Sequence, residues 1–199
     1  MQTQGIETRQ RIIEKSLQLF SVKGYFNTSI SDILQATDLT KGGLYGHFRS
    51  KEEVWYAVYE QAAFTWRKIV FREIQNISDP IEKIERLIEN HLKDYIGGNV
   101  FEGGCFFLNS MLELTGQSNA MCSRVSSGYT RFLELFRSWL KEADEMGMLK
   151  KDLNFDEVST FLLVALNGAA ALYTPRKDHG ILTQTINQIR SFMGQLRKE

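Results

Sequence analysis

The side chains with the clearest chemistry are hydrogen-bond donors gathered between Thr40 and Lys51. This stretch carries three formal positive charges, on Lys41, Arg49 and Lys51, and no acidic residue. His47 adds a further donor. Lysine and arginine commonly bind backbone phosphates, and histidine can donate to phosphate oxygens as well. The pattern therefore predicts a surface that binds a polyanion.

Two short helices around a tight turn must hold these donors. Ser29 caps a first helix over residues 29–36, and Asp32 stands at the acidic position of a capping box. Asp38 occupies the turn, and a second helix over residues 40–47 follows it. Two helices set at an angle by such a turn form a helix-turn-helix, whose second helix can enter a DNA major groove. The spacing therefore predicts DNA recognition by the second helix.

Residues 7–53 resemble the DNA-binding domain of the TetR family of bacterial transcriptional regulators. The string TKGGLYGHFRSKEEV carries that family's succession of a hydroxyl residue, a Lys-Gly pair, a Leu-Tyr pair, a His-Phe pair and a Ser-Lys-Glu run. The preceding TRQRIIEKSLQLFSVKGYFNTSISDI is similar to the family's first helix, its Lys-Gly-Tyr link and the entry to its second helix. The rest of the chain resembles the family in length and helical character.

The resemblance implies that both helices contact DNA phosphates. The implied contacts are Thr28 or Ser29 from the first helix, and Thr40, Lys41, Tyr45, His47 and Lys51 from the second helix and its flank. The free N–H groups and dipole at a helix amino end favour a phosphate near Thr40 and Lys41. Alternatively, Tyr45 and His47 only pack this small domain and the lysines form a solvated face. We prefer DNA contact because the charges lie together on the element that should face the groove.

Glycines in the second helix depart from the family pattern. Gly43 and Gly46 stand where a hydroxyl and an aromatic side chain are common, and each weakens a helix by up to about 1 kcal/mol. Few side chains remain to read bases, so we expect specificity to depend on close backbone approach, including at Gly43, and on DNA shape. Gln35 or Thr37 nearby can add contacts. Asp38 replaces the family's usual turn glycine and tolerates the left-handed conformation.

Composition limits the class of protein. The chain has 199 residues, zero formal net charge and a pI of about 6.8, so a local basic stripe on a neutral body favours sequence-selective reading over bulk adhesion. The N-terminus lacks the basic and apolar regions of a signal peptide. The most apolar run, residues 161–173, is interrupted by Asn167 and is too short to span a bilayer. Cys105 and Cys122 do not form a disulfide framework. We expect a cytoplasmic protein.

Nearly all of the chain is predicted to be helical, because it has two prolines and no sustained strict alternation. The expected helices cover residues 7–22, 29–36, 40–47, 51–75, 80–97, 103–115, 119–147, 155–173 and 179–197. Pro80 predicts a helix start, and Pro175 predicts a helix end. The expected fold is all-α, with a three-helix DNA-binding domain over residues 1–50 and a helical effector-binding and dimerisation domain over residues 51–199.

The last two predicted helices have features of a dimer interface. Helix 155–173 carries the small residues Ala165, Gly168, Ala169, Ala170 and Ala171, and helix 179–197 presents Leu182, Ile186, Ile189, Phe192, Met193 and Leu196. Pairing with a second copy as four helices would bury both faces, although ordinary packing accounts for part of them. The resemblance implies the same homodimer, as the two half-sites of a pseudopalindromic operator require.

The resemblance also implies a pocket for a small-molecule effector in the second domain. Polar side chains on apolar faces and nearby aromatic residues suit a hydrophobic, planar molecule. The predicted effector-binding residues are His91, Cys105, Phe107, Asn109, Tyr129 and Asn167. A lone inward histidine such as His91 is more often a satisfied core residue, so a structural role is the alternative.

Cys105 suggests a different mode of regulation. It follows Gly103 and Gly104 at a predicted helix start, where thiols react more readily. This arrangement is similar to that of electrophile- or oxidant-sensing members of the family. Most cysteines beside phenylalanines are buried and inert, and we prefer that interpretation.

No catalytic, metal or cofactor site is predicted. His47, His91 and His179 belong to separate predicted helices, and the chain has no HExxH, no paired-cysteine zinc spacing and no phosphate-binding glycine loop. The expected function is a repressor rather than an enzyme. An all-helical ligand carrier or enzyme with a structural N-terminal head is the second alternative.

Overall fold

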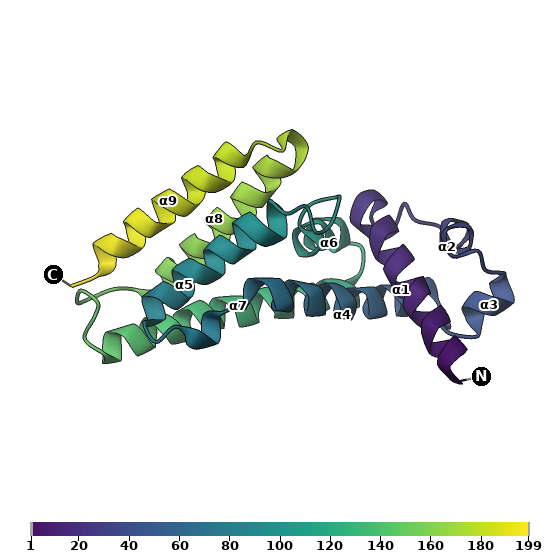
Figure 1. The fold of residues 1–199 in the computed structure, drawn as a ribbon, viewed down its shortest axis with the longest axis horizontal. Helices are drawn as coiled ribbons and strands as arrows, with labels where there is room; N and C mark the ends of the chain where they lie inside the picture. The colour runs from purple at the N-terminus through teal and green to yellow at the C-terminus, as the bar shows by residue number, and fades with distance from the viewer. Residues whose placement is uncertain (1, 199) are drawn as a thin grey trace. The chain divides into compact units, whose positions relative to one another are not determined.

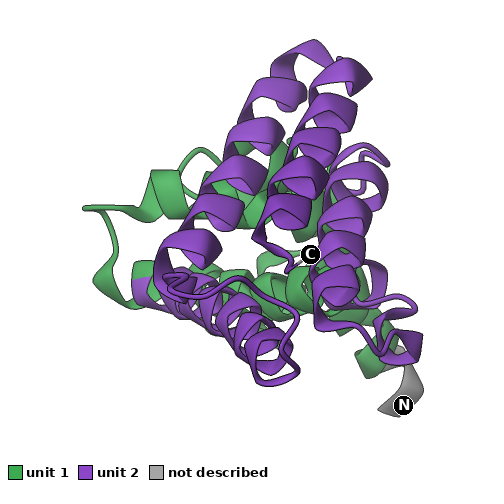
Figure 2. Cartoon of the chain, turned by 90° about the vertical axis from the view of Figure 1, so that its left-hand side faces the viewer, with its two compact units in different colours: residues 1–66, 101–122 green, residues 67–100, 123–199 purple. Residues whose placement is uncertain are grey.

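Helices account for about three-quarters of the residues that the computed structural model describes, 2–198, as Figure 1 shows. In this range the β structure is limited to an isolated bridge between Leu149 and Arg197. Contacts divide the chain into two units, coloured separately in Figure 2. The first runs to Trp66 and includes Phe101–Cys122; the second contains Arg67–Val100 and the chain from Ser123 onward. The expected all-α fold is confirmed.

The first unit holds the predicted DNA-binding head. Its elements are α1 (Gln2–Lys23), α2 (Ile30–Thr37), α3 (Lys41–Tyr45), most of α4 (Lys51–Val70), α6 (Phe106–Leu114) and the first turn of α7 (Asn119–Glu145). Helix α1 packs against α2. The core side chains include Ile12, Ile33, Leu44, Phe48, Val54 and Trp55, all almost fully buried. This core stabilises the short helices α2, α3 and α6, which could not be stable alone.

The second unit contains the end of α4, the 3₁₀ turn η1 (Ile74–Asn76), α5 (Pro80–Glu89), the π-helical segment η2 (Asn90–Ile96), most of α7, α8 (Phe155–Arg176) and α9 (His179–Leu196). Helix α8 packs against α9 and η2, and α5 packs against α9. Its core includes Ile84, Leu87, Leu92, Phe136, Leu140, Leu162 and Met193.

Three predicted helix boundaries are wrong, because a residue in the left-handed conformation or a π-helical segment interrupts the α-helix there. Helix α4 ends at Val70 rather than residue 75, and Glu73 beyond it has a left-handed backbone with φ 66°. The helix expected to reach residue 97 becomes π-helical at Asn90. Helix α6 begins at Phe106 rather than residue 103, because Gly104 before it has φ +89°.

Pro175 does not end its helix. It lies in the last turn of α8, which runs to Arg176 and ends where Lys177 adopts the left-handed conformation. Ala171 therefore loses the N–H that would have bonded its carbonyl, but a helix tolerates this loss near its carboxyl end, where carbonyls lack partners anyway.

Helix α8 is also longer than the apolar run that marked it in the sequence. Its 22 residues are long and apolar enough, by length and composition, to cross a membrane, although the run of residues 161–173 is too short by itself. In the second unit, however, 44% of its most apolar window is buried, and the helix packs against α9 and η2. This packing is that of a core helix.

Candidate nucleic-acid interface and effector residues

Helix α2 begins with the capping box that the sequence predicts. The Asp32 N–H donates to the Ser29 hydroxyl at 3.0 Å, and the Asp32 carboxylate accepts from the Ser29 N–H at 2.7 Å. Lys23 also donates to this carboxylate at 3.0 Å. The Ser29 hydroxyl also donates to this carboxylate, at 2.6 Å, and together with the Ser29 N–H and Lys23 it holds the pKa of Asp32 well below its usual range. The carboxylate therefore stays charged and keeps the start of α2 in place.

The turn between α2 and α3 has the predicted left-handed residue. Asp38 has φ 53° and ψ 47°, and its N–H donates to the Leu34 carbonyl. Thr40 then caps α3, because its hydroxyl accepts from the Gly43 N–H at 3.2 Å. The Leu44 side chain is buried on the inner side of α3. The opposite side is consequently free to face a partner.

The outer side of α3 is formed by Lys41, Gly42 and Tyr45, and Gly46 and Arg49 follow in the turn and bend after it; all five are exposed. Tyr45 is 49% exposed. The Lys41 ammonium and Arg49 guanidinium make no hydrogen bond or ion pair with any side chain or backbone group described in the structure. Unpaired donors on one side of a capped helix form a surface suited to anionic DNA. His47, at its edge, is partly buried.

Thr28 and Lys51 make hydrogen bonds inside the first unit. Thr28 is fully buried and its hydroxyl donates to the Gly24 carbonyl at 2.6 Å. The Lys51 ammonium donates to the carbonyls of Tyr25 and Thr28 at 2.8 and 2.9 Å, and it lies 4.2 Å from the centre of the Tyr25 ring. Burial lowers the Lys51 pKa. Both side chains therefore stabilise the link between α1 and α2.

Glu113 of α6 holds the same link from another side, and sequence reasoning missed it. Its two carboxylate oxygens accept from the N–H groups of Tyr25 and Phe26, each at 2.9 Å. Gly24, with φ +81°, comes so close that an added Cβ would lie 2.5 Å from a Glu113 oxygen. The link is thus held by a carboxylate on its N–H groups and by Lys51 on its carbonyls. An acidic residue on an apolar helix was the available signal.

A second close contact joins the start of the 101–122 segment to α1. The Gly103 N–H donates to the Ser21 hydroxyl at 3.1 Å. A Cβ on Gly103 would lie only 1.7 Å from the Ser21 carbonyl oxygen, so this position requires glycine. Together with Glu113, this contact makes the α6 segment part of the head's support.

Three predicted effector residues lie in the first unit. Cys105 is the N-cap residue of α6 and is 4% exposed. The Phe107 ring meets the rings of Tyr59 and Trp66 edge-on, with centroids 5.6 and 6.1 Å away. Asn109 is exposed and its amide donates to the Gly103 carbonyl at 2.7 Å, so it stabilises the turn before α6. It therefore does not lie on a buried apolar face, as the sequence suggested.

The other three lie in the second unit. His91 is 6% exposed, as its predicted inward orientation requires. Its ring lies 5.3 Å from that of Tyr95 and 6.2 Å from that of Phe132. Burial lowers the pKa of His91 from 6.5 to about 4. The imidazole is therefore neutral near pH 7.

Tyr129 and Asn167 form a polar pair between α7 and α8. The Tyr129 hydroxyl donates to the Asn167 side-chain oxygen at 3.2 Å, and the Asn167 amide donates to the Leu163 carbonyl at 3.0 Å. Tyr129 precedes Phe132 by one helical turn, so the pair and His91 approach the same side of α7. Within the described residues no cluster of His, Cys, Asp or Glu could hold a metal ion.

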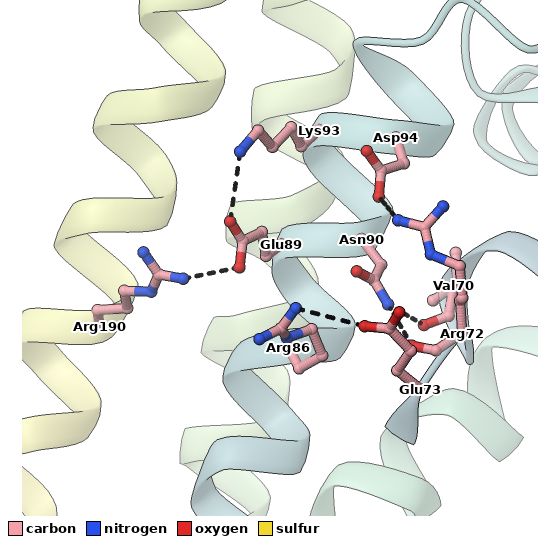
Figure 3. Close-up of polar contacts among 9 residues, drawn as sticks. All are labelled: Val70, Arg72, Glu73, Arg86, Glu89, Asn90, Lys93, Asp94 and Arg190. Atoms are coloured by element: carbon pink, nitrogen blue, oxygen red, sulfur yellow. Dashed lines mark hydrogen bonds and ion pairs between the residues drawn. The ribbon is translucent and has the colours of Figure 1, made fainter. Parts of the chain in front are cut away.

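A network at the end of α4 was not predicted (Figure 3). The buried Asn90 amide donates to the carbonyls of Val70 and Arg72 at 3.1 and 3.0 Å. Arg72 also pairs with Asp94 at 2.6 Å. The adjacent Glu89 accepts from Arg190 of α9 at 2.8 Å. A buried asparagine at the π-helical segment therefore fixes one carbonyl at the end of α4 and one just beyond it, a role that needs the tertiary fold.

Comparisons with known proteins agree with this arrangement. Residues 12–58 match the model of bacterial regulatory proteins of the tetR family, and residues 80–189 match the tetracyclin repressor-like C-terminal domain. The HTH-type transcriptional repressor DhaR of Mycobacterium sp. (strain GP1) is 27% identical over 81% of this chain and 79% of its own length.

Solved structures show the same fold. A TetR regulator from Chloroflexus aurantiacus J-10-FL aligns with a TM-score of 0.92 and 25% identity, covering 99% of this chain and 100% of its own. The TetR family regulator CifR, solved with a 26-base-pair operator duplex, aligns with a TM-score of 0.77 and 19% identity, covering 90% and 93%. The C-terminal model alone matches more than half of the chain, and the chain therefore belongs to the TetR family of DNA-binding bacterial transcriptional regulators.

Proposed function

We propose that this regulator is a cytoplasmic, homodimeric repressor that leaves a pseudopalindromic operator when a small effector binds. The observation that carries the proposal is the outer side of α3, where Lys41 and Tyr45 are exposed on a helix capped by Thr40. Two of the related proteins named as repressors, DhaR and BepR, align over about four-fifths of this chain. The division at residue 50 between a DNA-binding domain and an effector domain is part of the proposal.

The proposed DNA contacts use the exposed members of the predicted set. Thr40, Lys41 and Tyr45 contact phosphates from α3, and Ser29 contacts the backbone from the start of α2. His47 donates from the edge of the surface. Close approach at Gly43 brings the helix backbone to the duplex. CifR was solved bound to operator DNA, and the matching fold supports the same mode of docking here.

The homodimer is proposed to form through α8 and α9. Phe161, Val164 and Leu172 are 47, 63 and 57% exposed on α8, spaced three and eight residues apart so that they share one side. Gly168, with open space around it, lies on the same side. Exposed apolar side chains in a row suit a self-complementary contact with a second copy. Burial of this row against a second copy also accounts for the high apolar content of α8.

The effector is proposed to bind in the second unit, next to His91, Tyr129 and Asn167. Phe132, whose ring lies 6.2 Å from His91, supplies an aromatic wall. A neutral imidazole, a phenol and an amide can donate or accept hydrogen bonds but offer no charge. These groups favour an uncharged, hydrophobic or aromatic molecule. Phe107 lies in the first unit, where its ring packs against those of Tyr59 and Trp66.

Repression then follows from a two-state dimer. In one state the two α3 helices are spaced for successive major grooves, and in the other they are not. An effector with higher affinity for the second state lowers operator affinity by that difference.

Switching through Cys105 is the less favoured alternative. Its 4% exposure disfavours attack by an electrophile or oxidant in this state. Cys105→Ser tests it directly: full release of DNA by the variant after treatment with an electrophile would remove Cys105 from the mechanism. Treatment that releases only the wild type would establish it.

Selection of binding sites from random duplex DNA tests the repressor proposal. Purified protein should enrich one pseudopalindrome at two salt concentrations, and Lys41→Ala should lose it. A repeat with denatured and refolded protein removes any bound effector that masks binding. Absence of enrichment in both selections would favour a helical carrier or enzyme with a structural head.

A further inference from the structure

We infer that Glu113 is a positioning residue for operator binding: its carboxylate fixes the link between α1 and α2, and this link determines where α2 begins. The inference rests on the proposed function, because it uses the docking of α2 and α3 on DNA described above. Glu113 does not touch DNA in this account. It acts on binding through backbone groups that lie 87 and 88 positions earlier in the chain.

The link presents its N–H groups as an anion-binding turn. The consecutive N–H groups of Tyr25 and Phe26 donate to the two oxygens of the Glu113 carboxylate, each at 2.9 Å. Successive N–H groups in a turn form a concave site for an anion, known as a nest. Gly24 precedes them with φ +81°, and a Cβ at this position would collide with the carboxylate. The nest is therefore shaped for Glu113 and filled by it.

Lys51 holds the carbonyl groups of the same link. Its ammonium donates to the carbonyls of Tyr25 and Thr28 at 2.8 and 2.9 Å. Burial lowers the pKa of Lys51, and the negative charge of Glu113 opposes this shift. Two opposite charges thus stabilise one segment, the anion on its N–H groups and the cation on its carbonyls. Loss of Glu113 would leave two N–H groups without this acceptor and Lys51 without this opposing charge.

The DNA-binding elements begin where the link ends. Thr28 is followed directly by Ser29, which caps α2 and contacts the DNA backbone in the proposed mode. Helix α2 has eight residues and leads through the turn at residues 38–40 into α3. A link that is free to move would let the start of α2 move as well. The proposed contacts of α2 and α3 would then be correctly placed in only a fraction of the molecules.

The sign of the effect separates positioning from simple electrostatics. Removal of an acidic residue reduces repulsion of the DNA phosphates, so by charge alone it should strengthen binding. Removal of Glu113 should instead weaken binding, because the binding-competent link becomes less populated. The apparent Kd rises by the inverse of the competent fraction.

Operator affinity measured at several salt concentrations tests the inference. The probe is the duplex that wild-type protein enriches, titrated by fluorescence anisotropy in low and high salt. Glu113→Ala and the isosteric Glu113→Gln should each raise the Kd at least about tenfold at every salt concentration. The slope of log affinity against log salt should remain that of wild type, because no phosphate contact is lost.

Two control variants isolate the role of the carboxylate. Glu102→Ala removes an exposed acidic side chain from the same unit and should leave the Kd unchanged or slightly lower. Val58→Ala removes two methyl groups from the buried core of the same unit and leaves the link hydrogen bonds in place. It should lower the urea midpoint while the Kd of the folded protein stays that of wild type. Urea unfolding gives the folded fraction by which each Kd is corrected.

A wild-type Kd in Glu113→Ala would overturn the inference, and a wild-type Kd in Glu113→Gln would show that the side chain acts without its charge. Equal weakening in Val58→Ala would reduce the effect to general stability. A flatter salt slope in the Glu113 variants would indicate a lost phosphate contact instead of positioning. Glu113→Gln provides the test if the alanine variant does not fold. If wild type enriches no duplex, the proposed function fails and the inference fails with it, whereas enrichment with unchanged variant affinities refutes the inference alone.

Discussion

Removal of the Glu113 carboxylate should loosen the link between α1 and α2. The two oxygens accept from the Tyr25 and Phe26 N–H groups at 2.9 Å each. Hydrogen bonds to charged groups contribute about 1.5–3 kcal/mol apiece. One of these two is exposed, so Glu113→Ala should cost roughly 2–4 kcal/mol in local stability. Glu113→Gln keeps one acceptor oxygen and should lose about half as much.

Amide hydrogen exchange measures this effect at the two affected groups. A loss of about 2–4 kcal/mol raises the exchange rates of the Tyr25 and Phe26 amides roughly 30- to 1,000-fold, if opening of the link limits exchange. Urea unfolding should show a lower midpoint as well. Glu102→Ala removes an exposed carboxylate from the same unit and serves as the control. Exchange within about threefold of wild type in Glu113→Ala would refute the reasoning, since about 0.6 kcal/mol lies below a single charged hydrogen bond.

Three further predictions follow from burial and space. Gly103→Ala forces a Cβ to within 1.7 Å of the Ser21 carbonyl oxygen and should lower the free energy of urea unfolding by more than about 3 kcal/mol. Gly194→Ala, in open space on α9, should instead raise it by up to about 1 kcal/mol. Equal urea midpoints for the two variants would contradict the close contact at Gly103. His91 has a pKa of 6.5 in the unfolded chain but of about 4 in the folded chain, so the stability conferred by neutral His91 is present above pH 6.5 and is lost, by roughly 3 kcal/mol, as the pH falls towards 4. His91→Phe should abolish this part of the pH dependence of unfolding. An unchanged pH profile in the variant would show that His91 is not the group responsible. Leu172→Arg should give monomers in analytical ultracentrifugation with the helix content of wild type, and a persistent dimer would exclude this face of α8 from the interface.

Local sequence was sufficient for the helix-turn-helix. The Ser29–Asp32 box, the left-handed Asp38 and the Thr40 cap involve residues within a few positions of one another, and each has the predicted geometry. Such bonds depend on side-chain type and spacing, so they can be read directly. The all-α fold follows equally from apolar periodicity and few prolines.

Helix ends and side-chain partners depended on residues far away. Asn90 lies in a π-helical segment, and its side-chain amide donates to carbonyls about twenty positions earlier in the chain. Periodicity gives no sign of that departure, because the same residues suit an ordinary helix. Similarly, nothing near Pro175 in the sequence distinguishes the last turn of a helix from the residue after it.

The roles of the cations show the same division. The sequence alone determined that residues 40–51 carry positive charge on a helix-turn-helix, because charge and local spacing are properties of neighbouring residues. Only the tertiary structure decided which cations can reach a partner: Lys51 binds carbonyls that lie 23 and 26 positions earlier in the chain, while the Lys41 and Arg49 side chains pair with no other described residue. Glu113 joined the head for the same reason, since its partners lie 87 and 88 positions away. Contacts over such distances form only when the whole core has folded, so they leave no periodic signal in the sequence.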